Sequence, residues 1–364
     1  MYLREVKVWN FRNLERVHLT LEERCIFILG DNAQGKSNFL EALFLLARGY
    51  SPQGARGEEM IRFGEEIASV SAKIVEEGEY FVKEVILRRN GSREWRLNGK
   101  RERKWEPIWL VGYFPEDFAI VGGAPKDRRD FLNQAISLVY PPYDRFLKSY
   151  EKIVERRNLL LREGGPEELL PVYTEKMINL GSQIVEWRVQ YLRTFTPILS
   201  EVYRMIFGEG ELEVQYESLG YRWEEGIGEG LRKAHRELER EEFVRGMTLF
   251  GPHRDEITLL LRGKEVRDFA SQGEKKGIAL SLRLAEMRMI KRMKKSRVIL
   301  LLDDLFSEFD TQRRELILRG VNGEGQVFVT TTEREMTQKA VREFSALVLF
   351  MTAGKMSQRS QGFL

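Results

Sequence analysis

The chain has 364 residues, with 59 Lys and Arg against 56 Asp and Glu, so only a local basic patch can argue for nucleic-acid binding. The length allows two domains, or one large domain with an insertion. A single cysteine, Cys25, excludes an internal disulfide and the usual cysteine-rich zinc sites, and no apolar run approaches the roughly 20 residues that span a membrane. We therefore expect a cytoplasmic protein with no membrane partner.

The first 122 residues carry the pattern of β-strands. Residues 1–19 alternate apolar and polar side chains and carry charges throughout, which predicts a strand rather than a signal peptide. Further strands are predicted at residues 25–29, 68–76, 80–89 and 95–97, with a hairpin turn at Asn90-Gly91.

A complete phosphate-binding loop follows the apolar run at residues 25–29, with the sequence Gly30-Asp31-Asn32-Ala33-Gln34-Gly35-Lys36-Ser37. An apolar helix is predicted from residue 38, so strand, glycine loop and helix come in the required order. The loop would cradle ATP phosphates with backbone N–H groups at the positive end of the helix. Lys36 would reach the β and γ phosphates, and Ser37 would ligate Mg²⁺. A glycine turn with a surface lysine is the alternative. Residues 1–122 are accordingly predicted as the N-terminal part of an ATPase head.

The hydrophobic period changes to 3.6 after Pro125, which predicts a mostly helical insertion over residues 123–244. Helices are predicted at residues 144–162, 172–198 and 229–245, the second ending near Pro197. The first of them carries a basic stripe opposite its apolar face, formed by Arg145, Lys148, Lys152 and Arg156. The stripe can follow DNA phosphates, or it can be a solvated face paired with Glu151 and Glu155. Both interpretations stay open on the sequence alone.

Strand patterns return in residues 245–364, the predicted C-terminal part of the head. Strands are predicted at residues 257–261 and 266–269 around a turn at Gly263, then a long helix at 274–294 and strands at 298–302 and 326–329. A basic cluster near residues 291–297 is expected to complement the negative end of that helix.

Two carboxylates, Asp303 and Asp304, end the apolar strand at residues 298–302. Phosphate-loop ATPases place acids there to hold Mg²⁺ and to activate water. Asp303 would bind the metal, directly or through water, and Asp304 would orient or deprotonate the attacking water. A solvated turn or a helix cap is the alternative for two such acids, and the phosphate loop disfavours it.

Residues Ser271-Gln272-Gly273-Glu274, ahead of the long helix, resemble the signature motif of ABC-type ATPases. In that class the serine hydroxyl and glycine N–H groups bind the γ-phosphate of ATP held by the opposite subunit, so Ser271 and Gly273 indicate an ATP-dependent homodimer. A capping box between Ser271 and Glu274 explains the same residues, and both can hold together. Residues 307–310 match the loop that crosses the dimer interface in this class, and Thr331 is the candidate in place of a switch histidine.

These motifs together resemble the RecF family of bacterial recombination and DNA-repair ATPases, which is related to SMC heads. The resemblance runs nearly end to end and rests above all on Gly251-Pro252-His253-Arg254-Asp255 in combination with Ser271-Gln272-Gly273. Other matching segments are residues 11–14, 30–40, 114–117, 128–132, 150–161 and 301–310. Glu256 stands where the family has a second aspartate.

The resemblance implies an α/β fold, an ABC-type, SMC-like P-loop ATPase head with an inserted, mostly helical second lobe. It also implies dimerisation on ATP, slow hydrolysis that resets the protein, and binding to duplex DNA near gaps or junctions. RecO and RecR would be partners in loading recombinase. Lys36 and Asp304 would be the catalytic residues.

Other functions share parts of the pattern. An SMC-type head would need hundreds of heptad residues in the insertion, and residues 125–230 lack them. A nuclease coupled to an ABC head would need an additional acidic metal domain, and a transporter ATPase would need a membrane partner. A nucleotide-dependent scaffold that does not hydrolyse ATP stays open.

Overall fold

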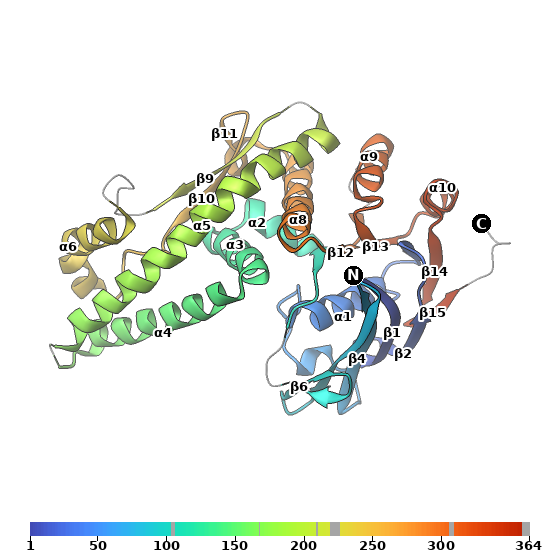
Figure 1. The fold of residues 1–364 in the computed structure, drawn as a ribbon, viewed down its shortest axis with the longest axis horizontal. Helices are drawn as coiled ribbons and strands as arrows, with labels where there is room; N and C mark the ends of the chain where they lie inside the picture. The colour runs from blue at the N-terminus through green and yellow to red at the C-terminus, as the bar shows by residue number, and fades with distance from the viewer. Residues whose placement is uncertain (103–105, 167, 209, 219–225, 306–308, 359–364) are drawn as a thin grey trace. The chain divides into compact units, whose positions relative to one another are not determined.

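The computed structural model describes residues 1–102, 106–166, 168–208, 210–218, 226–305 and 309–358. The chain forms two compact units (Figure 1), the first made of residues 1–118, 205–208 and 276–364, the second of residues 119–204 and 209–275. The division of the sequence at 122/123 and 244/245 stays a proposal about domain organisation. Among the described helices, none is long and apolar enough to cross a membrane.

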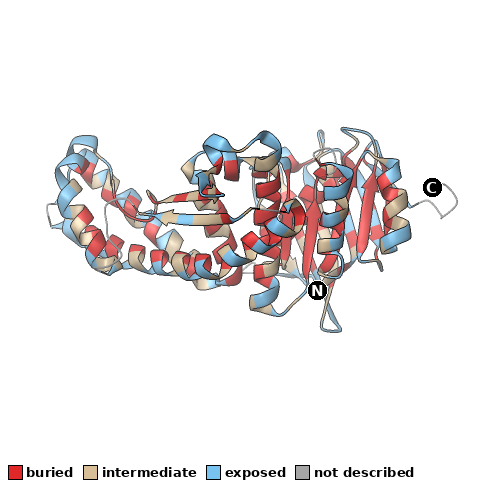
Figure 2. Cartoon of the chain, turned by 90° about the horizontal axis from the view of Figure 1, so that it is seen from above, coloured by how far each residue is buried: buried red, intermediate tan, exposed pale blue. Residues whose placement is uncertain are grey.

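A mostly parallel six-stranded sheet is the centre of the first unit, with the strand order β15-β14-β3-β13-β12-β8. Its strands are β3 (Cys25–Leu29), β8 (Leu110–Tyr113), β12 (Val298–Leu302), β13 (Gly325–Thr331), β14 (Leu347–Thr352) and β15 (Lys355–Gln358), of which only β15 pairs antiparallel. β3 and β12 are continuous apolar runs and are buried along their whole length (Figure 2), as parallel strands covered on both faces require. Burial also raises the pKa of the Cys25 thiol to about 12, which makes it inert.

An antiparallel sheet with the order β2-β1-β4-β5-β6-β7 completes the first unit. Its strands are β1 (Tyr2–Phe11), β2 (Leu14–Thr20), β4 (Ile67–Glu76), β5 (Glu79–Arg88), β6 (Arg93–Leu97) and β7 (Lys100–Arg101). The strands predicted at 68–76, 80–89 and 95–97 are confirmed. The single strand predicted over residues 1–19 is wrong, because the chain turns at Arg12 and Asn13 and pairs with itself as a hairpin. Both strands face one core, so the alternation does not reveal the turn.

Helix α1 (Lys36–Arg48) lies between the two sheets and packs against β8 and β13 of one and β1, β4 and β5 of the other. A helix that is apolar on most sides must be buried on most sides. Nearly all residues of α1 are buried. Around this core lie α9 (Thr311–Val321), α10 (Arg334–Phe344), the short 3₁₀ turns η1 (Glu58–Met60) and η2 (Pro115–Asp117), and most of α8 (Gln272–Lys294).

The second unit is mostly helical, as predicted. It contains α2 (Phe118–Gly122) from its second residue on, α3 (Pro125–Val139), α4 (Pro141–Glu163), most of α5 (Leu169–Phe207), α6 (Ile227–Arg245), α7 (Val266–Phe269) and the start of α8. α4 and α5 run antiparallel, since Arg157 donates to Thr174 at 2.9 Å near one end and Tyr143 stacks on Trp187 near the other. The expectation that Pro197 ends α5 is wrong. Leu199, Val202 and Tyr203 beyond it are buried, and their packing outweighs the lost hydrogen bond.

A three-stranded antiparallel sheet of β9 (Leu212–Glu217), β10 (Glu256–Leu261) and β11 (Lys264–Glu265) accompanies these helices. The turn at Gly263 is confirmed as a β10–β11 hairpin. The strand predicted at residues 266–269 is wrong, because these residues form α7. Only Val266 of this segment is buried, and a single helical turn is enough to bury that one side chain.

The Gly-Pro-His-Arg-Asp motif, Gly251 to Asp255, forms a buried polar hub of the second unit. Arg188, only 1% exposed, donates to the carbonyl oxygen of Pro252 at 2.7 Å, and the Asp255 carboxylate accepts from the hydroxyls of Tyr216 and Ser218. Gly251 has φ +103°, and a Cβ there would lie 2.5 Å from the Tyr150 hydroxyl. The same hydroxyl lies 2.7 Å from His253 Nδ1, and burial lowers the pKa of His253 to about 4. These contacts explain the motif as a structural element.

Candidate nucleotide-binding site

The carboxyl ends of four parallel strands bring the predicted phosphate-binding residues together in the first unit. β3 leads into the glycine loop, β12 into Asp303 and Asp304, β8 into Pro115, and β13 ends at Thr331. Neighbouring parallel strands place these ends at one edge of the sheet, where ligands of α/β proteins bind. A pocket of about 200 Å³ lies there, lined by Asn32, Ala33, Gly35, Lys36, Ser37, Asn38, Pro115, Asp303, Asp304 and Thr330.

The loop Gly30–Ser37 has a backbone that its two glycines permit. Gly35 has φ +110°, and a Cβ at this position would lie 2.7 Å from the side-chain oxygen of Asn13. A Cβ on Gly30 would collide with the carbonyl oxygen of Met351. Ala33 also lies in the left-handed region, at φ 61°. The chain therefore wraps tightly before α1 begins at Lys36, which is the conformation that turns N–H groups toward an anion.

The Lys36 side chain closes back over the loop. Its Nζ atom donates to the carbonyl oxygens of Gly30 at 2.7 Å and Asp31 at 2.8 Å, and the residue is 7% exposed. Burial lowers the pKa of Lys36 below its ordinary value, although the carboxylates of Asp304 and Asp303 act in the opposite direction. A cation is thus held at the position where phosphates would bind.

Asp303 joins β12 to the loop and to β13. Its Oδ1 atom accepts from the Ser37 hydroxyl at 3.0 Å and from the Thr330 hydroxyl at 2.7 Å. Burial raises the pKa of Asp303, and these two hydrogen bonds partly oppose the rise. The arrangement places a carboxylate and a hydroxyl oxygen side by side, which fits Mg²⁺ because that ion takes one or two protein oxygens and completes its shell with phosphates and water.

Asp304, the candidate for activating water, lines the same pocket. Its backbone has φ 46°, a left-handed conformation that aspartate tolerates better than most residues. The Asp304 N–H donates to the Thr330 hydroxyl at 2.8 Å, so the threonine holds both acids at once.

Thr330 is one of three pocket residues that the sequence analysis did not assign to the site, with Asn38 and Pro115. The sequence pointed instead to Thr331, whose hydroxyl accepts from the N–H of Glu333 at 3.0 Å and which does not line the pocket. Successive residues of a strand face opposite sides, and the run of three threonines gives no indication which of them faces the pocket. In the structure, the position of β13 in the sheet turns Thr330 toward the pocket.

The predicted signature residues belong to the second unit. The Ser271 hydroxyl accepts from the Glu274 N–H at 3.3 Å, and Glu274 accepts from the Ser271 N–H at 2.9 Å, so the capping box is present. Gly273 is exposed, and apart from its chain neighbours and the nearby backbone of its own helix, no atom of the described residues lies within 4 Å of a Cβ built on it. Packing does not require a glycine there. Of the loop predicted at residues 307–310, residues 307 and 308 lie outside the described residues, and Asp310 caps α9 through the Arg313 N–H at 2.9 Å.

Comparison with known proteins places this geometry in a family. The family model described as "RecF/RecN/SMC N terminal domain" matches residues 2–358. The chain is 32% identical to the DNA replication and repair protein RecF of Lactobacillus delbrueckii subsp. bulgaricus over 377 residues, which cover 100% of this chain and 98% of the relative.

Solved structures show the same likeness. The recombination mediator protein RecF with ATP, in the RecFOR pathway, superposes with a TM-score of 0.89 at 30% identity and covers 99% of this chain and 98% of that one. An SMC head domain from Pyrococcus furiosus is similar in fold, with a TM-score of 0.57, 15% identity and coverage of 98% and 95%. The fold is thus the ABC-type, SMC-like ATPase fold, and the chain belongs to the RecF family.

Proposed function

We propose that this chain is a DNA-binding ATPase of recombinational DNA repair and replication that works as an ATP-dependent homodimer. The observation that carries the proposal is the meeting of Lys36, Ser37, Asp303 and Asp304 in one pocket, in a chain of the RecF family. A solved relative is described with ATP and placed in the RecFOR pathway, which supports ATP as the ligand and RecO and RecR as partners. Acting on chromosomal DNA, the protein would work in the cytoplasm.

ATP hydrolysis would use the contacts already present in the pocket. Lys36 would exchange its bonds to the Gly30 and Asp31 carbonyl oxygens for bonds to the β and γ phosphates. Ser37 and Asp303 would hold Mg²⁺, which when bound neutralises charge on the phosphate oxygens. Asp304 would orient a water molecule and accept its proton while the water oxygen bonds to the γ-phosphorus and the bond to the bridging oxygen breaks.

Dimerisation would bring the N-terminus of α8 from one copy to the γ-phosphate held by the other. An exposed glycine with open space on its Cβ side lets a phosphate approach the backbone closely. Ser271 would donate its hydroxyl to the same phosphate. Because only the closed dimer offers these donors, ATP binding favours closure, and loss of the γ-phosphate favours opening.

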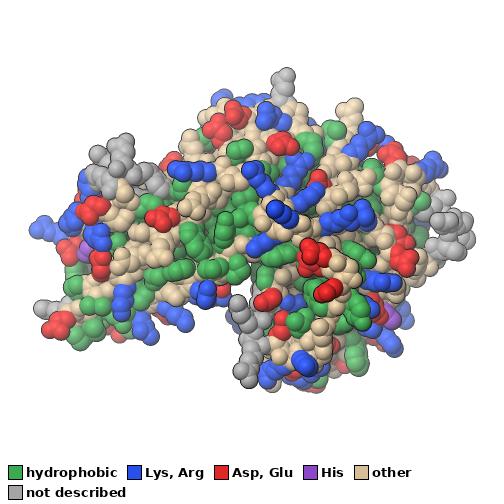
Figure 3. Space-filling view, in the orientation of Figure 1, with side chains coloured by type: hydrophobic (Ala, Val, Ile, Leu, Met, Phe, Trp, Pro, Cys, Tyr) green, Lys and Arg blue, Asp and Glu red, His purple; other side chains and the backbone are tan. Residues whose placement is uncertain are grey.

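DNA would contact the basic stripe of α4. Arg145, Lys148, Lys152 and Arg156 are all exposed, and Figure 3 shows Lys and Arg side chains along this helix. Lys148 pairs with Asp144 at 2.7 Å, which partly supports the alternative of a solvated face. Exposed pairs of this kind contribute about 0–1 kcal/mol, so phosphates can displace the aspartate.

The salt dependence of DNA affinity tests this proposal. Replacing both Lys152 and Arg156 with glutamine is expected to flatten the slope of log K against log salt by about 1.8, since each lost phosphate contact accounts for about 0.9. Filter binding or fluorescence anisotropy with ATP and a gapped duplex measures the slope. Arg236→Gln on α6, which removes a cation paired with Glu229 at 3.1 Å, is the matched control. An unchanged slope in the double variant would remove the stripe from the DNA site, and no DNA binding by the unaltered protein would contradict the function.

A further inference from the structure

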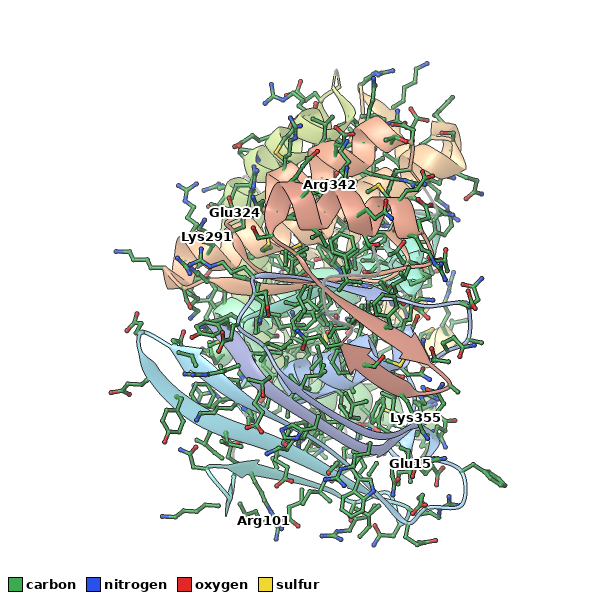
Figure 4. The ribbon with its side chains drawn as sticks, turned by 90° about the vertical axis from the view of Figure 1, so that its right-hand side faces the viewer. Glu15, Arg101, Lys291, Glu324, Arg342 and Lys355 are labelled. Atoms are coloured by element: carbon green, nitrogen blue, oxygen red, sulfur yellow. The ribbon has the colours of Figure 1, made fainter. Side chains whose placement is uncertain are left out.

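A cluster of five basic residues lies at the end of α8 in the first unit, outside the nucleotide pocket. Its members, named here the α8 basic cluster, are Lys291, Arg292, Lys294, Lys295 and Arg297. Lys291 pairs with Glu324 at 2.5 Å, and Figure 4 shows the two side by side. The other four have no carboxylate partner in the part of the chain that the structure describes.

The end of the helix accounts for only part of this charge. Cations favour the negative C-terminal end of a helix, and the effect falls off within the last turn. Lys291, Arg292 and Lys294 belong to the last turn of α8, but the helix ends at Lys294 and the other two residues follow it. Lys295 and Arg297 are exposed, and like charges held close together repel each other. An anionic partner would relieve that repulsion.

The cluster continues along the edge of the parallel sheet at which the strands begin, opposite the edge that holds the nucleotide pocket. Arg297 directly precedes β12, and the residues that directly precede the neighbouring strands β3, β13 and β8 are Arg24, Glu324 and Trp109. The strand order β3-β13-β12-β8 and its register place these residues in a row. Because neighbouring strands lie about 4.8 Å apart, the row is about 14 Å long, the length of about four residues of extended chain.

Trp109 adds an apolar surface to the row. The Lys294 ammonium nitrogen lies 5.1 Å from the centre of the Trp109 ring, which is close enough for a cation–π interaction. The Trp109 carbonyl oxygen accepts from the Ile299 N–H at 2.8 Å, which fixes the residue to β12. Trp109 is half-buried, so part of it is accessible. Cations and an aromatic ring together offer an anionic partner both charge and a surface for an apolar side chain.

The charges along the row favour a peptide over a nucleic acid. Glu324 lies between Arg24 and Arg297 in the row, and Glu22 and Glu23 come directly before Arg24. A nucleic-acid strand carries a negative charge at every nucleotide, so its backbone would meet these carboxylates. A peptide can place neutral side chains beside them and its own carboxylates beside the cations.

We propose that an acidic segment of a partner protein binds along this row in an extended conformation. Its carboxylates pair with the α8 basic cluster and Arg24, and one apolar side chain packs on Trp109. Exposed ion pairs are weak one by one, so the segment makes several contacts at once, and its affinity falls as salt screens them. The surface lies away from the nucleotide pocket, so the inference does not depend on ATP binding.

Fluorescence anisotropy of a labelled acidic peptide tests this surface on the full chain without ATP. The probe is a peptide of about ten residues, glutamate with one central phenylalanine, long enough to cover the row. Replacing Lys294, Lys295 and Arg297 together with glutamine is expected to raise its dissociation constant at least about 10-fold, since each exposed ion pair contributes a factor of a few. Exchanging the phenylalanine for alanine is expected to weaken binding a few-fold, and Trp109→Ala is expected to remove that difference.

A matched variant keeps the change in net charge the same. Replacing Arg101, Arg342 and Lys355 with glutamine removes three exposed cations of the same unit, all labelled in Figure 4, and is expected to leave the dissociation constant unchanged. Phosphate release by the triple variant of the cluster is expected to stay at the unaltered rate, which separates a lost contact from a lost fold.

Each other outcome overturns the proposal. No binding of the acidic peptide by the unaltered protein would contradict it directly. An unchanged dissociation constant in the triple variant would leave the cluster as a complement to the end of α8, and an equal loss in the matched variant would show attraction to net charge alone. Oligothymidylate of the same length that binds the cluster more tightly than the peptide would assign the surface to nucleic acid instead.

Discussion

Replacing Lys36 with alanine is expected to lower the rate of ATP hydrolysis at least about 100-fold, the scale seen when one preorganised charge-stabilising group is removed from an enzyme. Lys36 is held within the loop by two carbonyl oxygens at 2.7 and 2.8 Å, so it needs little rearrangement to meet the phosphates. Alanine leaves the developing negative charge without a cation. Phosphate release, measured with and without gapped DNA, reports the effect.

Two controls make the Lys36 experiment specific. Lys100→Ala removes an exposed lysine from β7 of the same unit and is expected to leave hydrolysis unchanged. Asp304→Asn is expected to abolish phosphate release while ATP still binds, because the pocket keeps Lys36, Ser37 and Asp303. Release by Lys36→Ala at the unaltered rate would contradict the assignment, and absence of release from the unaltered protein would favour a non-hydrolysing scaffold.

Replacing Glu286 with alanine is expected to destabilise the first unit by about 3–5 kcal/mol, the cost of breaking a buried ion pair from one side. Glu286 is fully buried on α8 and pairs with Arg48 of α1 at 3.1 Å and with Arg283 at 2.8 Å. Burial alone would raise the pKa of Glu286, but the two guanidinium groups outweigh it and leave that pKa below its ordinary value. Alanine would leave both arginines buried with one partner fewer.

This ion-pair network extends to the residues beside the nucleotide pocket, so a loss of stability in the network is expected to lower ATP hydrolysis as well. Arg283 also pairs with Asp117 at 2.6 Å, and Asp117 accepts from the Phe114 N–H at 3.0 Å beside Pro115 of the pocket. Urea unfolding, with hydrogen exchange of the β12 amides as the local probe, measures the loss.

A surface ion pair between Lys291 of the same helix and Glu324, which precedes β13, supplies the matched control for Glu286. Lys291 and Glu324, labelled side by side in Figure 4, pair at 2.5 Å in solvent, and Glu324→Ala is expected to cost no more than about 1 kcal/mol. A similar small cost for Glu286→Ala would show that the buried network does not hold the unit together.

The parts that could be predicted are those in which local sequence decides structure. The apolar run of β3, the glycine loop and α1 follow one another without a gap, and the acids follow β12 directly. The conformation of each of these segments depends mainly on residues that are close in the sequence. The turn at Arg12 and Asn13, the continuation of α5 through Pro197 and the helical turn α7 depend on packing from distant parts of the chain, which periodicity does not record.

The same division runs through the site. Lys36, Ser37 and Asp303 could be predicted because a spacing pattern marks them. Thr330 was missed because strand register, not composition, decides which threonine faces the pocket. The network of Arg48, Asp117, Arg283 and Glu286 links three segments far apart in sequence, α1, η2 and α8, and the sequence of each segment alone gives no sign of this pairing.

The measurement that tests the account most directly is light scattering on the Asp304→Asn protein, with and without ATP, Mg²⁺ and a short gapped duplex. Blocking hydrolysis should trap the closed state, so a monomer is expected to become a DNA-bound dimer only when ATP is present. Adding Ser271→Arg at the α8 N-terminus should return it to a monomer that still binds ATP. A monomer under every condition would contradict the ATP-bridged dimer.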